Sequence, residues 1–126
     1  MTKELEQLEH EVTVLKQEAT DRKTRAVALR VETEQKRDEA TAFLSENEPR
    51  LPYRMAAARV GDPEWTLERV AAHRRELDEA RRVIREAEEL LPGLDELIAR
   101  DWLANARLVK AMRQCDQAAR QLQVVT

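Results

Sequence analysis

The chain has 126 residues and a mass of 14.6 kDa, which is room for one domain. Charged residues make up 37% of it and aromatic residues 3%, and the chain contains only two glycines, so the composition favours long helices over a sheet. The formal net charge of −3 is too small to give a general attraction to nucleic acid or to anionic lipid.

The residue content predicts a cytoplasmic protein. Residues 1–18 are charged throughout and contain no apolar segment of the kind found in a signal peptide. No stretch approaches the run of about 18 apolar residues that crosses a bilayer, so we expect no membrane contact. Cys115 is the only cysteine, which excludes an intrachain disulfide and is compatible with a reducing compartment.

Residues 1–48 predict one long helix with a coiled-coil seam. Neither glycine nor proline interrupts this stretch, and its apolar residues recur at heptad spacing. A stripe this narrow is typical of a coiled-coil contact rather than of the wide face of a bundle helix. The seam fades over residues 32–39, which carry no apolar side chain. The partner-binding residues that we predict are Leu5, Leu8, Val12, Leu15 and Leu29.

Prolines and glycines divide the remainder of the chain. Residues 49–61 form a connector, within which residues 53–60 could be a short helix that ends at Gly61. Asp62 followed by Pro63 predicts the start of a second helix, because Asp is a preferred N-cap and Pro a preferred first helical residue. Pro92 and Gly93 predict a tight break before a third helix, so residues 62–126 are expected to form an antiparallel helical hairpin.

The lengths of these helices do not match, which argues for a partner. At about 1.5 Å per residue the first helix is roughly 25 Å longer than the hairpin. An exposed apolar stripe on the excess length favours association with a second copy or with a helix of a larger assembly. The charges that flank the seam attract and repel equally often in a parallel dimer, so orientation and copy number stay open.

An alternative function uses residues 55–70. The spacing of Ala57, Gly61 and Leu67 resembles the core of a helix-turn-helix, in which small residues let two helices meet closely. Asp62 stands where an apolar residue is usual, and the acidic residues that follow would face phosphates. We therefore favour a short helix ended by Gly61, and we do not favour a nucleic-acid partner. DNA binding would depend on Arg54, Arg59 and Arg69.

Catalysis and metal binding are not expected. His10 and His73 are the only histidines, and neither has the glutamate three residues earlier that di-iron bundles use. Cys115 lies on an apolar stripe, where a thiol usually packs. The sequence thus predicts an all-α, single elongated domain over residues 1–126 without catalytic, metal or cofactor site. Its expected role is that of a scaffold, adaptor or chaperone-like protein that forms a homo-oligomer or binds another protein.

Overall fold

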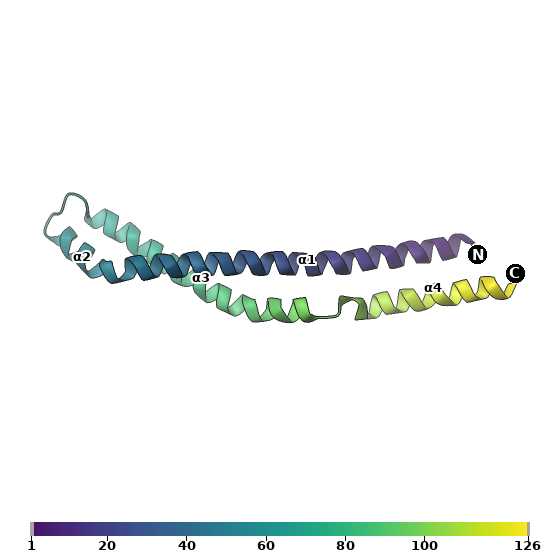
Figure 1. The fold of residues 1–126 in the computed structure, drawn as a ribbon. Coiled ribbons are helices and arrows are strands. Elements are labelled where there is room, and N and C mark those ends of the chain that lie inside the picture. Colours follow the sequence, from purple (N-terminus) through teal and green to yellow (C-terminus); the bar gives the residue numbers. More distant parts are fainter. Residues whose placement is uncertain (1, 126) are drawn as a thin grey trace. The chain divides into compact units, whose positions relative to one another are not determined.

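The computed structural model describes residues 2–125, with side chains over residues 3–124, and every regular element in this range is helical. The elements are α1 (Thr2–Asn47), η1 (Glu48–Arg50), α2 (Leu51–Arg59), α3 (Leu67–Ala99), η2 (Trp102–Ala104) and α4 (Ala106–Val125) (Figure 1). The predicted all-α fold with a long N-terminal helix is confirmed. The antiparallel hairpin predicted over residues 62–126 does not form at Pro92 and Gly93, because both residues lie inside α3 and α4 is placed with the N-terminal part of α1.

The chain divides into two compact units, and α1 contributes to both. The first unit comprises residues 1–28 and 96–126, and the second comprises residues 29–95. Each unit brings one part of α1 together with a later helix that runs antiparallel to it.

In the first unit, α4 packs beside the N-terminal part of α1 (Figure 1). Leu15 of α1 forms a cluster with Leu108 and Ala111 of α4, and Val12 packs against this cluster. Leu108 is only 1% exposed, so it is the most deeply enclosed large side chain of this unit. Apolar burial of this kind is what holds two amphipathic helices together.

In the second unit, α3 packs along the C-terminal part of α1. Leu77, Leu91 and Leu94 are buried on the inner face of α3. Arg30 of α1 is tied to Asp95 of α3 at 2.5 Å, and this hydrogen bond raises the pKa of the Arg30 guanidinium, with Glu34 adding to the effect.

Alanine is the most frequent buried hydrophobic residue. Among the described residues, eight of the fourteen buried hydrophobic side chains are alanines. A methyl group fills little space, so helices that meet through alanines lie close together. The eight are Ala19, Ala26, Ala40, Ala57, Ala58, Ala80, Ala87 and Ala111.

The break predicted at Pro92 and Gly93 is wrong, because both residues lie inside α3. A proline within a helix removes one backbone hydrogen bond and costs about 3 kcal/mol. The buried leucines on either side, Leu91 and Leu94, offset this cost by keeping the segment packed. The helix ends seven residues after Pro92, at Ala99.

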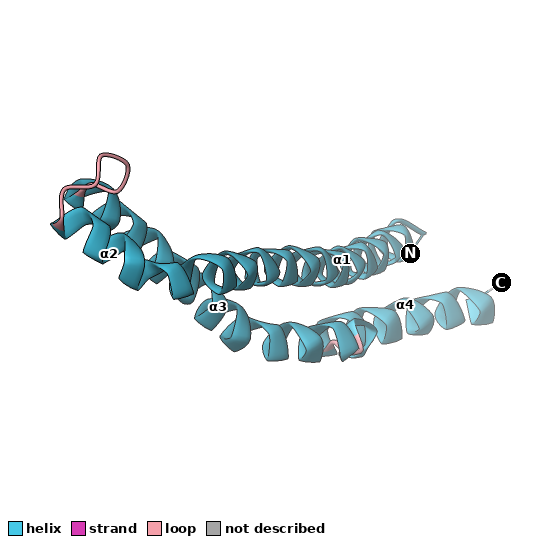
Figure 2. Ribbon diagram, turned by 60° about the vertical axis from the view of Figure 1, so that its left-hand side comes forward, coloured by secondary structure: helices cyan, strands magenta, loops and turns pink. Residues whose placement is uncertain are grey.

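The start of α3 also differs from the prediction. Asp62 caps a local turn, since its carboxylate accepts hydrogen bonds from the backbone N–H groups of Glu64 and Trp65 at 2.7 and 3.2 Å. The helix itself begins at Leu67, where the Thr66 hydroxyl accepts a hydrogen bond from the Arg69 N–H at 3.1 Å. Two successive caps therefore separate α2 from α3, and the second one starts the helix. Figure 2 shows the intervening loop in pink.

Candidate protein-interaction surface

An apolar groove lies in the first unit, where the chain passes from α3 to α4. It has a volume of about 730 Å³ and is lined chiefly by Val27 and Ala28 of α1 together with Ala99, Trp102 and Leu103. Small side chains on α1, including buried Ala19, leave the space that the groove occupies. Exposed apolar grooves of this kind are typical of protein contact sites.

Two polar caps create the wall of the groove. Asp101 adopts an extended backbone (φ −80°, ψ 96°), and its carboxylate accepts a hydrogen bond from the Leu103 N–H at 3.0 Å. Asn105 then starts α4, because its side-chain oxygen accepts a hydrogen bond from the Arg107 N–H at 2.8 Å. These caps satisfy backbone groups that the interrupted helix would otherwise leave unpaired. The short helix η2 between them presents its apolar side chains outward.

Trp102 is fixed in place within this wall. Its indole Nε1–H donates a hydrogen bond to the Leu97 carbonyl oxygen at 2.9 Å. The Arg100 guanidinium lies over its ring, 4.5 Å from the centroid, in a cation–π contact. The groove wall is therefore formed before any partner arrives, which lowers the entropic cost of binding.

The surface of the groove combines apolar area with positive charge. Val27 is 43% exposed and Leu103 is 53% exposed, so both present apolar area to water. Lys23 and Arg100 also line the groove and are exposed. Asp101 is the one acidic residue in the lining, and its carboxylate is occupied by the cap described above. An apolar partner with acidic flanks would be complementary to this surface.

The predicted seam residues are divided between burial and exposure. Leu15 is buried and Val12 packs on its cluster, while Leu5 and Leu8 are half-buried in the same unit. These side chains face α4 of their own chain. Leu29 belongs to the second unit and is 41% exposed.

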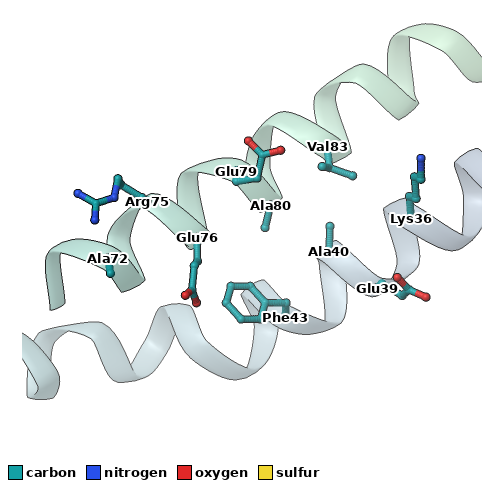
Figure 3. Close-up of a pocket in the computed structure, with 10 residues that line it drawn as sticks. All are labelled: Lys36, Glu39, Ala40, Phe43, Ala72, Arg75, Glu76, Glu79, Ala80 and Val83. Carbon is teal, nitrogen blue, oxygen red and sulfur yellow. The ribbon is translucent and has the colours of Figure 1, made fainter. Parts of the chain in front are cut away.

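A second groove, of about 810 Å³, lies in the second unit between α1 and α3. Figure 3 shows Ala40 and Phe43 of α1 facing Ala80 and Val83 of α3 across it. Unlike the apolar groove, it is bordered by charged side chains of both signs, namely Lys36, Glu39, Arg75, Glu76 and Glu79. This mixed border suits a solvated, ion-paired face.

Glu79 on this face is paired with a neighbouring arginine of α3. The Arg82 guanidinium hydrogen-bonds to the Glu79 carboxylate and also reaches Glu86 at 2.6 Å. The hydrogen bond from Arg82 lowers the pKa of Glu79 below its ordinary value, and the same contact raises the pKa of Arg82. Both side chains are therefore engaged within α3.

The segment proposed as a helix-turn-helix is built differently from that motif. Residues 60–66 separate α2 from α3, whereas the motif joins its helices by a turn of about three or four residues. Gly61 has a φ of 82° and ends α2, as predicted. The guanidinium groups of Arg54 and Arg69 both lie over the Trp65 ring, 4.3 and 4.1 Å from its centroid. Two of the three arginines named for DNA binding are thus stacked on a tryptophan.

His73 is buried beneath this stacked cluster. Its Nε2 lies 2.8 Å from Nη1 of Arg54, which also contacts the Asn47 side-chain oxygen at 3.1 Å. Because a guanidinium can only donate, His73 Nε2 accepts this hydrogen bond. The rings of Phe43 and Trp65 meet His73 edge-on. The arrangement gives His73 a packing role, and His10 is exposed.

Neither a metal site, nor a membrane-spanning helix, nor a similar protein points to a further role for the described residues. Over residues 2–125, no group of three or more His, Cys, Asp or Glu side chains is placed to hold a metal ion. None of the helices in this range is long and apolar enough to span a bilayer. No protein-family model, curated protein or solved structure matches the chain.

The groove residues fall within the third helix that the sequence predicts after Pro92 and Gly93. In the structure Trp102 and Leu103 lie instead in η2, between two caps. The signal that could have located them is the pair Asp101 and Asn105, since both are preferred N-cap residues placed four apart inside an apolar stripe.

Proposed function

We propose that this chain is a non-enzymatic helical interaction protein that associates with copies of itself through the apolar groove. The observation that carries the proposal is the exposed apolar wall formed by Leu103, opposite Val27, on a backbone held by Asp101. Burying such area removes apolar surface from water at about 25 cal/mol per Å². The protein would then serve as a scaffold or adaptor built from repeated copies.

We place the association surface at the groove rather than at the heptad seam because seam residues are already packed within the folded chain. Val12 and Leu15 are already engaged with Leu108 and Ala111, so a partner would have to displace α4 to reach them. Val27 and Leu103 need no such displacement because they are exposed in the folded chain. Association through the groove therefore leaves the core of the first unit intact.

The experiment is the solution mass of the purified full chain, measured by light scattering after size exclusion over a wide concentration range. We expect species larger than 14.6 kDa that grow with concentration. The Leu103→Asp variant is expected to be monomeric, because a carboxylate in the groove would have to be desolvated on association. Circular dichroism on the same samples checks that the helical content is unchanged.

The matched control is Val31→Asp, which places the same charge at an exposed apolar position outside the groove. This variant should associate as the parent chain does. A parent chain that stays monomeric at every concentration would contradict the proposal, as would a Leu103→Asp variant that associates normally.

A further inference from the structure

His73 is a buried titratable side chain that the proposed function does not use. It is 7% exposed, and its contacts come from α1, from α2 and from the loop before α3. Histidine is the side chain whose charge ordinarily changes between about pH 5 and pH 8. A histidine that joins several elements in a buried position can therefore couple their packing to pH.

Arg54 connects His73 to α2. Its Nη1 donates to His73 Nε2 at 2.8 Å and to the Asn47 side-chain oxygen, at the end of α1, at 3.1 Å. The same guanidinium lies over the Trp65 ring, 4.3 Å from its centroid. One side chain of α2 thus reaches α1, α3 and the loop that precedes α3.

The rest of α2 contributes little to its attachment. The helix has nine residues, and its buried side chains are the alanines Ala57 and Ala58. A helix this short is not stable in isolation, and burying a methyl group stabilises it less than burying a larger side chain would. Tyr53, the large aromatic residue of α2, is 72% exposed. The position of α2 therefore depends strongly on the contacts of Arg54.

The contact between Arg54 and His73 requires a ring nitrogen that carries no proton. A guanidinium has donors and no acceptor, so a protonated Nε2 would face a second donor at 2.8 Å and form no hydrogen bond. The two groups would also carry like charges, which repel most strongly where water is excluded. We infer that His73 is a pH sensor, and that its protonation releases α2 and the adjoining loop from α3.

Glu76 acts in the opposite direction to Arg54. Its carboxylate lies 3.7 Å from His73 Nδ1 and would attract a protonated ring. The Glu76 side chain is 62% exposed, so water weakens this attraction. The contact of Arg54 is shorter, and Arg54 is half-buried. Over the described residues, these two are the charged side chains in hydrogen-bonding or ion-pairing distance of the ring, and the closer one opposes protonation.

Further charges lie one contact away from His73. Arg69 lies over the Trp65 ring and is 4.0 Å from the Glu64 carboxylate, and the Asp62 carboxylate caps the turn before α3. Ordinary carboxylates and guanidinium groups do not change their charge between about pH 5.5 and pH 7.5. Measurements within this interval therefore address histidine.

The test is hydrogen–deuterium exchange of the purified full chain at about pH 7.5 and about pH 5.5, with the rates corrected for the intrinsic effect of pH on exchange. The reporting amides are those at the end of α2, such as the Val60 N–H that donates to the Ala56 carbonyl oxygen. Their protection should fall by about tenfold or more at the lower pH, because a hydrogen bond to a charged group is lost. The amides of residues 10–20, in the first unit, are the internal reference and should keep their protection.

Two histidine variants separate the sensor from a general effect of acid. His73→Gln keeps an acceptor for Arg54 but cannot take up a proton, so its α2 should be equally protected at both pH values. The matched control is His10→Gln, which removes the exposed histidine of α1 and should respond as the parent chain does. A His73→Gln variant that still loses protection at the lower pH would overturn the inference. A parent chain with equal protection at both pH values would do the same.

A second measurement needs no substitution. The ring signals of His73, followed by NMR, should change over the same pH interval as the protection of α2. Protection that is lost while the ring signals stay constant would contradict the sensor, and so would a ring that titrates while α2 stays protected. The result is independent of the proposed self-association, because His73 and its contacts lie in the second unit and the apolar groove lies in the first.

Discussion

Replacing Leu108 by alanine should destabilise the first unit strongly. Leu108 is almost fully enclosed and packs with Leu15 and Ala111 in the only cluster of buried hydrophobic residues that joins α4 to α1 among the described residues. The substitution removes the apolar contacts of three carbon atoms and leaves a cavity beside Leu15 and Ala111. Leu108 is the most deeply buried member of this cluster.

The expected loss of unfolding free energy in Leu108→Ala follows from the size of the cavity that the substitution leaves. Truncating a buried leucine to alanine costs about 2–5 kcal/mol, depending on how far the surroundings collapse. Val12 is half-buried at the edge of the cluster and can move inward, so we expect about 2–3 kcal/mol. Against a total free energy of unfolding of about 5–15 kcal/mol, this is a large fraction.

Urea denaturation followed by circular dichroism measures the effect. With a slope of about 1–3 kcal/mol per M, the midpoint should fall by about 1–2 M without a change of slope. Leu103→Ala is the control, because this leucine is half-exposed and its truncation should cost less than about 0.5 kcal/mol. If both variants shifted the midpoint equally, the packing of α4 on α1 would not be the source of stability.

Two further predictions concern α3. Arg82→Gln should return the pKa of Glu79 upward toward its ordinary value, as read from carboxyl chemical shifts during an NMR titration. Because the folded pKa is lowered, the contribution of Glu79 to stability is present above pH 4.5 and is lost as the pH falls through the lowered value, and an unchanged Glu79 pKa would contradict this account. Pro92→Ala should raise the free energy of unfolding by about 1–2 kcal/mol, because it restores a helix hydrogen bond whose gain exceeds the loss of chain stiffness. A loss of stability in urea would indicate that the helix does not continue through Pro92.

The heptad pattern of α1 correctly predicted one of the two rows of residues on its buried face. Residues 5, 12, 19, 26, 33 and 40 follow the heptad, and all of them are buried or half-buried. Thr33 therefore continues the seam where no apolar side chain is present, because its hydroxyl donates to the Leu29 carbonyl oxygen at 2.6 Å and needs no water. Leu29 lies in the other register and is exposed.

The remaining errors of the sequence-based prediction have a common physical origin, which is that local patterns do not specify tertiary contacts. Local stop signals at Pro92 and Gly93 were outweighed by the burial of Leu91 and Leu94, and burial depends on a distant part of the chain that local patterns do not specify. The interruption at residues 100–105 was set by two capping side chains inside an apolar stripe. The groove could not be predicted because it exists only where that interruption lies beside α1.

The alanines of the buried face limit which substitutions this protein accepts there. In a core of large side chains, most substitutions remove volume and leave cavities. A buried alanine such as Ala19 or Ala87 has almost nothing to remove, and any larger side chain must push two closely packed helices apart. Substitutions along this face are therefore limited to side chains about as small as alanine, such as glycine and serine.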